Sequence, residues 1–116
     1  KAFEPGMIPD GFYTVGDADV PAPDFQAAIV AAVSTVTHIA EADEDGKLIG
    51  VPVSQPGVID LHCRRLGLCA GVTDAPLRST TEVYPDSPRV DEAACNAAQV
   101  AALRAAVDFA LTQPMR

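Results

Sequence analysis

Asp60, His62 and Cys63 are the residues whose types and spacing could carry catalysis in this chain. If residues 58–63 form a strand, Asp60 and His62 share one face, since alternate side chains of a strand point the same way. A carboxylate that orients an imidazole beside a nucleophilic thiol is the chemistry of a catalytic triad. The sequence does not show that these groups meet in space, so we favour a surface histidine, a structural aspartate and a protein without catalytic activity.

Arg64 and Arg65 follow directly and could bind a carboxylate or a phosphate group. Two cations are also typical of the last turn of a helix, and Gly67 is a typical residue just after one. The pair therefore has two interpretations. It either ends a helix, or it joins Asp60 and His62 in a small ligand-binding site at a subunit boundary.

An acidic loop contains Glu41, Asp43, Asp45 and Gly46, spaced like the first half of a calcium-binding EF-hand loop. The twelfth position of such a loop must supply a bidentate glutamate, but here it is Pro52. Asp-Gly before an apolar run is also ordinary turn chemistry. We therefore expect a turn here and no bound metal.

Soft metal ligands are few and poorly spaced for zinc, which favours close pairs of ligands. His62 and Cys63 are adjacent and point to different faces, while Cys69 and Cys95 have no ligand partner at a suitable spacing. Three cysteines without a C-x-x-C pair predict reduced thiols, although a bridge between Cys63 and Cys69 stays open. Phosphate-binding glycine motifs are also absent, so we expect neither metal nor cofactor.

The balance of charge excludes two classes of partner. Sixteen acidic and eight scattered basic residues give a net charge of −8, which disfavours binding to nucleic acid or to an anionic membrane surface. The longest apolar run, residues 27–33, is too short to cross a bilayer. Residues 1–5 lack the apolar stretch of a signal peptide, so with the reduced thiols we expect a cytoplasmic protein.

The first 22 residues form the segment that most suggests a partner. Residues 1–23 hold four of the ten prolines, which disfavours a helix and leaves room for a strand only within residues 11–20. A solvated tail would not carry the apolar side chains of this stretch, which are Phe3, Met7, Ile8, Phe12 and Tyr13. We expect an extended arm that docks through these residues on its own domain or on a neighbouring subunit.

Residues 23–116 are expected to form one domain, whose first elements are a helix and a hairpin. Pro23 and Asp24 suit a helix start, and Phe25, Ile29 and Val33 recur at helical spacing, which predicts a helix over residues 24–33 with Val36 on the same stripe. Residues 35–41 and 47–53 read as a hairpin that turns at Asp45-Gly46.

Two further helices and a strand follow. A short helix is expected to end at Arg64-Arg65-Leu66-Gly67, and residues 80–84 are the next plausible strand. Ser87-Pro88 predicts the start of a long helix over residues 90–111. Its larger apolar residues form the expected buried stripe, namely Val90, Val100, Leu103, Val107 and Leu111 with Ala93, Ala97 and Ala110.

These elements predict an α+β fold in which two Ala-rich helices pack on a small, mainly antiparallel sheet, preceded by the arm. Since no catalytic set converges, we expect a non-catalytic structural or interaction subunit of a homo-oligomer or larger assembly. The alternative is a small cofactor-free enzyme or ligand-binding protein that uses the site around Asp60, His62, Arg64 and Arg65.

Overall fold

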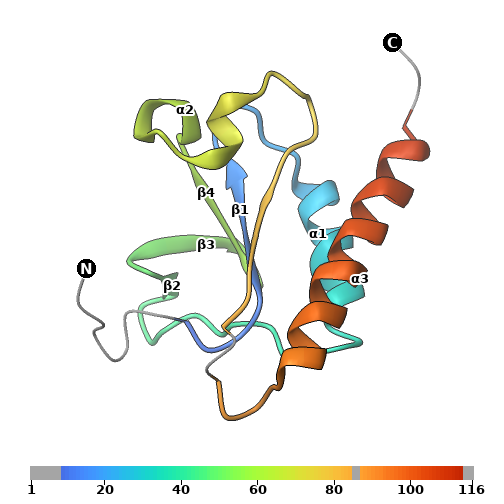
Figure 1. Cartoon of the computed structure of the whole chain (residues 1–116). Helices are drawn as coiled ribbons and strands as arrows, with labels where there is room; N and C mark the ends of the chain where they lie inside the picture. The colour runs from blue at the N-terminus through green and yellow to red at the C-terminus, as the bar shows by residue number, and fades with distance from the viewer. Residues whose placement is uncertain (1–8, 85–86, 114–116) are drawn as a thin grey trace.

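The computed structural model describes residues 9–84 and 87–113 and shows an α+β fold (Figure 1). In chain order its elements are β1 (Tyr13–Asp17), α1 (Pro23–Val33), β2 (Lys47–Leu48), β3 (Val51–Gln55), β4 (Val58–Leu61), α2 (Cys63–Leu66), the 3-10 helix η1 (Cys69–Val72), β5 (Thr80–Glu82) and α3 (Glu92–Leu111). The α+β prediction is therefore confirmed.

Within the described residues the strands form one mixed sheet of five, in the order β2-β3-β4-β1-β5. β1 and β4 run parallel and place Val15 beside Ile59. The pairings β1–β5, β2–β3 and β3–β4 are antiparallel, which agrees with the expected mainly antiparallel sheet. Strand β1 thus lies inside the sheet and β5 lies at its edge.

The described part of the expected arm is a structural element of the domain. Residues 13–17 form β1, bracketed by the prolines at 9 and 21, and Phe12 is fully buried in the core. Tyr13 is half-buried against the second core cluster described below. Phe12 also exchanges backbone hydrogen bonds with residues 38 and 40. Phe3, Met7 and Ile8, the other expected interface residues, lie outside the described residues.

The prediction that residues 35–41 and 47–53 pair as a hairpin is wrong. Ile39 pairs instead with Phe12 in an isolated parallel bridge, while β2 and β3 form a hairpin that turns at Ile49-Gly50. Both turn residues have positive φ, as tight hairpin turns require. A second hairpin joins β3 and β4 through Pro56-Gly57, so the sheet is built from shorter strands than expected.

The helix over residues 24–33 is confirmed as α1, which buries Phe25, Ile29 and Val33. Val36 lies beyond its end and is exposed. The short helix expected to end at Arg64-Arg65-Leu66-Gly67 is confirmed as α2, which is a single turn because residues 58–61 form strand β4. Gly67 ends α2 in the left-handed conformation, as its position predicts.

Helix α3 begins at Glu92 with Asp91 as its N-cap, not at Ser87. The Asp91 carboxylate accepts a hydrogen bond from the backbone N–H of Ala94 at 2.8 Å. The Ser87 hydroxyl instead accepts from the backbone N–H of Arg89 and closes a turn before the helix. The strand predicted near residues 80–84 is confirmed as β5.

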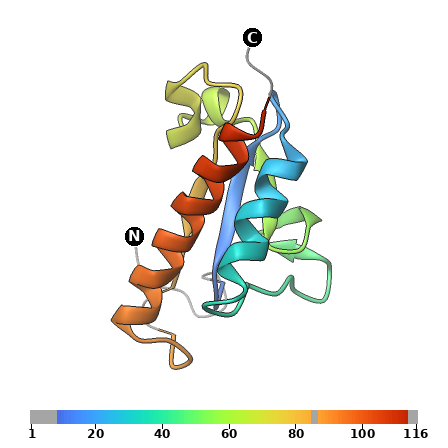
Figure 2. The same cartoon turned by 90° about the vertical axis from the view of Figure 1, so that its right-hand side faces the viewer.

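The buried residues of the described part of the chain form two apolar clusters. The first joins Phe12 to the inner faces of α1 and α3, which lie side by side over the sheet and run in opposite directions (Figures 1 and 2). Within it the rings of Phe25 and Phe109 pack with their centroids 5.6 Å apart. The second cluster contains Val15, Ile59 and Cys63 and includes Leu48 of β2.

The buried face of α3 is not the one that the sequence predicts. Cys95, Ala98 and Ala102 are buried, whereas the larger Val100, Leu103, Val107 and Leu111 are exposed. Alanine allows two helix axes to approach closely, so α1 packs against the small side chains of α3. The bulky stripe is left on the other side of the helix.

Candidate functional site

The carboxyl ends of the parallel strands β1 and β4 bring several polar side chains to one end of the sheet. Asp17 ends β1 and Asp19 follows it, while His62 and Cys63 come directly after β4. In α/β sheets, ligands commonly bind beyond the carboxyl ends of parallel strands. This strand-end cluster is therefore the first candidate site.

Asp17 and Arg78 form a buried ion pair at this end. Arg78 Nη1 lies 3.4 Å from Asp17 Oδ2, and the two side chains are only 9% and 2% exposed. The same guanidinium donates to the backbone carbonyl of Thr73, while Asp17 Oδ1 accepts from the N–H of Asp19. The pair ties the segment after η1 to the end of β1, which is a structural role.

His62 pairs with Asp19 and not with Asp60. His62 Nδ1 lies 2.8 Å from Asp19 Oδ1, and both side chains are about half exposed. Strand β4 ends at Leu61, so His62 has turned toward α2, whereas Asp60 lies against Gly16 and faces the start of α1. The shared face that the sequence suggested for Asp60 and His62 does not form.

The Cys63 thiol is unsuited to nucleophilic attack. Cys63 is completely buried, and its Sγ lies 3.4 Å from the Leu61 carbonyl and 3.6 Å from that of Gly16. Burial raises the pKa of the thiol, and the nearby Asp17 carboxylate adds to the rise, so the reactive thiolate is disfavoured.

Arg64 and Arg65 lie on the exposed surface of α2. Arg64 Nη2 pairs with Asp74 at 2.5 Å, which lowers the pKa of that carboxyl, and Arg64 Nε donates to the Gly71 carbonyl. Arg64 thus connects α2 to the segment that follows it. The helix-end interpretation fits this placement.

The acidic loop is a turn, as expected. The Asp43 carboxylate accepts from the backbone N–H groups of Asp45 and Lys47, and the Gly46 N–H donates to the Asp43 carbonyl. Among residues 9–84 and 87–113, no three metal-ligating side chains gather as a metal site would need. No described helix is long and apolar enough to span a bilayer.

The second candidate site is the outer surface of α3. Four large aliphatic side chains line up there at spacings of three, four and four residues, with Val100 58% exposed, Leu103 68%, Val107 50% and Leu111 79%. We call these four residues the α3 outer face. Residues at such spacings lie on one side of a helix, so their exposed areas form a continuous stripe.

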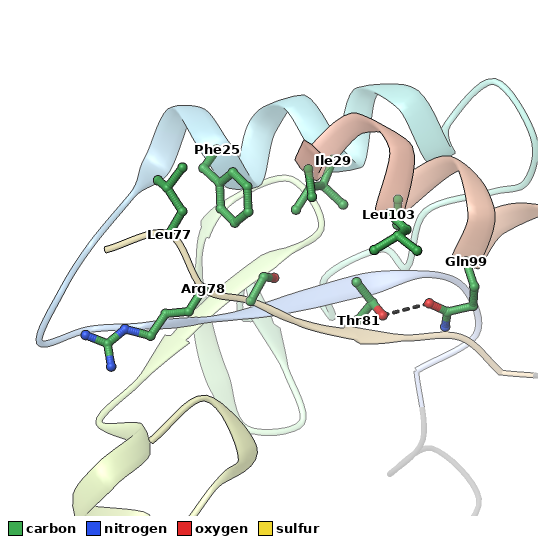
Figure 3. A pocket seen from close by; sticks show the side chains of 10 residues that line it. Phe25, Ile29, Leu77, Arg78, Thr81, Gln99 and Leu103 are labelled. Carbon is green, nitrogen blue, oxygen red and sulfur yellow. Dashed lines mark hydrogen bonds between the residues drawn. The ribbon is translucent and has the colours of Figure 1, made fainter. Parts of the chain in front are cut away.

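A groove of about 450 Å³ runs beside this face, between α3, α1 and the segment that contains β5 (Figure 3). Phe25, Ile29 and Leu103 form its apolar walls. At one end the Thr81 hydroxyl donates to Gln99 Oε1 at 2.7 Å (Figure 3). This bond fixes α3 over β5.

Sequence reasoning singled out His62 but missed its partner Asp19, and it missed both members of the pair between Asp17 and Arg78. The available signal was Asp17-Ala-Asp19 directly after an alternating apolar stretch, which marks the polar end of a strand. It was obscured because the proline-rich surroundings favoured an arm. The exposed stripe of α3 was seen, but it was assigned to the core.

Comparison with known proteins adds no identification. No protein-family model matches the sequence, and no curated protein is significantly similar to it.

Proposed function

We propose that this chain is a non-catalytic structural subunit that assembles with copies of itself through the α3 outer face. One observation carries the proposal. Four large aliphatic side chains, each at least half exposed, are aligned along one side of a 20-residue helix. Single exposed apolar residues are ordinary, but a contiguous stripe of them is typical of a protein–protein contact.

The charge around the stripe favours a second copy as the partner. The chain has a net charge of −8, yet α3 carries no charged residue between Glu92 and Arg104, and Asp108 balances Arg104. Two acidic copies can therefore approach over α3 with little repulsion, whereas a partner selected by charge would be drawn to other surfaces. The spacing of Val100, Leu103 and Val107 also matches the alternation of three and four residues in paired helices.

The three free thiols agree with assembly in a reducing compartment, and we propose the cytoplasm.

Sedimentation velocity of the full chain, from low micromolar to millimolar concentration, tests the proposal. We expect the average mass to rise with concentration, and we expect Leu103→Asp to abolish the rise because it places a charge in the contact. Val72→Asp is the matched control, since Val72 is 89% exposed on η1. A monomer at all concentrations, or equal effects of the two substitutions, would overturn the proposal.

The Asp19–His62 pair supports a second candidate, a small-molecule site at the strand ends. The Asp19 carboxylate pairs with Nδ1 of the imidazole, which leaves Nε2 available for a hydrogen bond to a ligand. Amide shifts of Asp19 and His62 on addition of pooled small metabolites would support this role. Shifts that persist in His62→Ala would argue against it.

A further inference from the structure

Among the described residues, strand β5 at the edge of the sheet leaves the backbone N–H and C=O of Thr81 without a strand partner. The Thr14 N–H donates to the Gly57 carbonyl, so the backbone N–H and C=O of Thr14 point toward β4. The backbone groups of its neighbours Tyr13 and Val15 therefore point toward β5. Their partners Glu82 and Thr80 therefore face β1. Thr81, between them, directs its N–H and C=O away from the sheet.

This open edge lies on the flank of α3 that bears Leu103 of the α3 outer face. Leu103 lines the groove that α3 forms with the β5 segment, and Thr81 bonds Gln99 across it (Figure 3). On the opposite flank of α3, Val100 of the outer face lines a groove with Arg104 and with Val36 after α1, so the stripe spans the ridge between the two grooves. Figure 2 shows α1 and α3 adjacent in the helix layer.

This inference rests on the proposed function: we propose that the second copy of the chain pairs with the first along β5. The two β5 strands pair antiparallel about a two-fold axis at Thr81, and the two α3 helices meet above them along the flank that bears Leu103. One symmetric contact would thus extend the sheet and cover the apolar stripe from its Leu103 side.

The register is self-complementary. With the axis at Thr81, each Thr81 N–H meets the Thr81 carbonyl of the second copy, which forms a hydrogen-bonded pair. Glu82 then lies opposite Thr80 of the second copy, so like charges are not placed directly opposite each other. The Thr81 side chain remains on the helix side, bonded to Gln99.

Amide hydrogen exchange of the unmodified full chain, followed by NMR at low and high protein concentration, tests the pairing. The Thr80 and Glu82 amides face β1 and should be protected at both concentrations. The Thr81 amide should exchange rapidly in dilute protein and become at least about tenfold slower when the protein associates. Rapid exchange of Thr81 in associated protein would overturn the β5 pairing.

A pair of variants at the same position gives a second readout. Thr81→Pro removes an N–H that β1 does not use, whereas Thr81→Val removes the bond to Gln99 but keeps the N–H. We expect Thr81→Pro to weaken self-association at least about tenfold, and Thr81→Val to change it by less than about threefold. Equal weakening by both variants would contradict the proposal.

The two proposals fail in distinguishable ways. Association that needs Leu103 but leaves the Thr81 amide unprotected would refute the β5 pairing and retain the α3 contact. A chain that stays monomeric at every concentration would refute both. If Thr81→Pro does not fold, the exchange measurement on the unmodified chain still decides the question.

Discussion

Replacing Asp17 by asparagine should destabilise the fold severely. The substitution keeps the size of the side chain but removes its charge, and it leaves the buried Arg78 guanidinium without its carboxylate. Arg78 Nε already has no hydrogen-bond partner among the described residues. The remaining Arg78 contacts are to backbone carbonyls, which do not neutralise a full positive charge.

The size of the expected destabilisation follows from the distance between the two charges and from their burial. At a separation of 3.4 Å, two unit charges attract by about 5 kcal/mol in a medium of effective dielectric constant near 20. Removing one partner of a buried pair costs about 3–5 kcal/mol, because the other charge stays buried. Since a domain is stable by about 5–15 kcal/mol in all, Asp17→Asn should remove a large part of the free energy of unfolding.

Urea unfolding followed by far-UV circular dichroism measures this loss. Asp74→Asn is the control, because it removes the carboxylate of the exposed pair with Arg64 and should change the urea midpoint little. Replacing both Asp17 and Arg78 by apolar residues, Asp17→Leu with Arg78→Met, should restore part of the stability. A loss below about 1 kcal/mol in Asp17→Asn would refute the reasoning, since a buried charge would then be tolerated alone.

Two further predictions concern titratable groups. In native protein, a thiol reagent should modify the exposed Cys69 rapidly and the buried Cys63 and Cys95 only after unfolding, so a fast phase that survives in Cys69→Ser would contradict the structure. Hydrogen bonding from Ser87, and then from His38, lowers the pKa of Asp10, so this carboxylate stabilises the fold above its ordinary pKa and the stabilisation is lost as the pH falls through the lowered value. Asp10→Asn should therefore lower the urea midpoint at pH 6 but not at pH 2, and an equal effect at both would show that the charge is not involved.

Local signals predicted the elements whose positions depend on neighbouring residues. The stripe of Phe25, Ile29 and Val33 located α1, and Gly67 located the end of α2. Strand β1 was missed as a central strand because its parallel partner β4 lies more than forty residues further along the chain. Such pairing leaves no nearby turn signal in the sequence.

In the candidate sites too, the sequence indicated what depends on neighbouring residues and missed what depends on contacts between distant parts of the chain. The sequence identified His62 as polar and accessible, but its partner Asp19 follows β1, more than forty residues earlier in the chain, so only the fold could supply the pair. The stripe of α3 was visible as a pattern, yet a helix lined with alanine on several sides offers two faces for packing. Ala98 and Ala102 form the buried face because α1 packs closely against them. This contact is tertiary, so the sequence of α3 alone does not indicate which face is buried.

Intermolecular NOEs test the central claim, self-association through the α3 outer face, most directly. A mixture of isotope-labelled and unlabelled full chain, at a concentration where the protein associates, reports methyl groups that touch the other copy. We predict isotope-filtered NOEs that involve the methyl groups of Val100, Leu103, Val107 and Leu111. NOEs confined to other exposed methyl groups, such as those of Leu66 and Val72, would contradict the account.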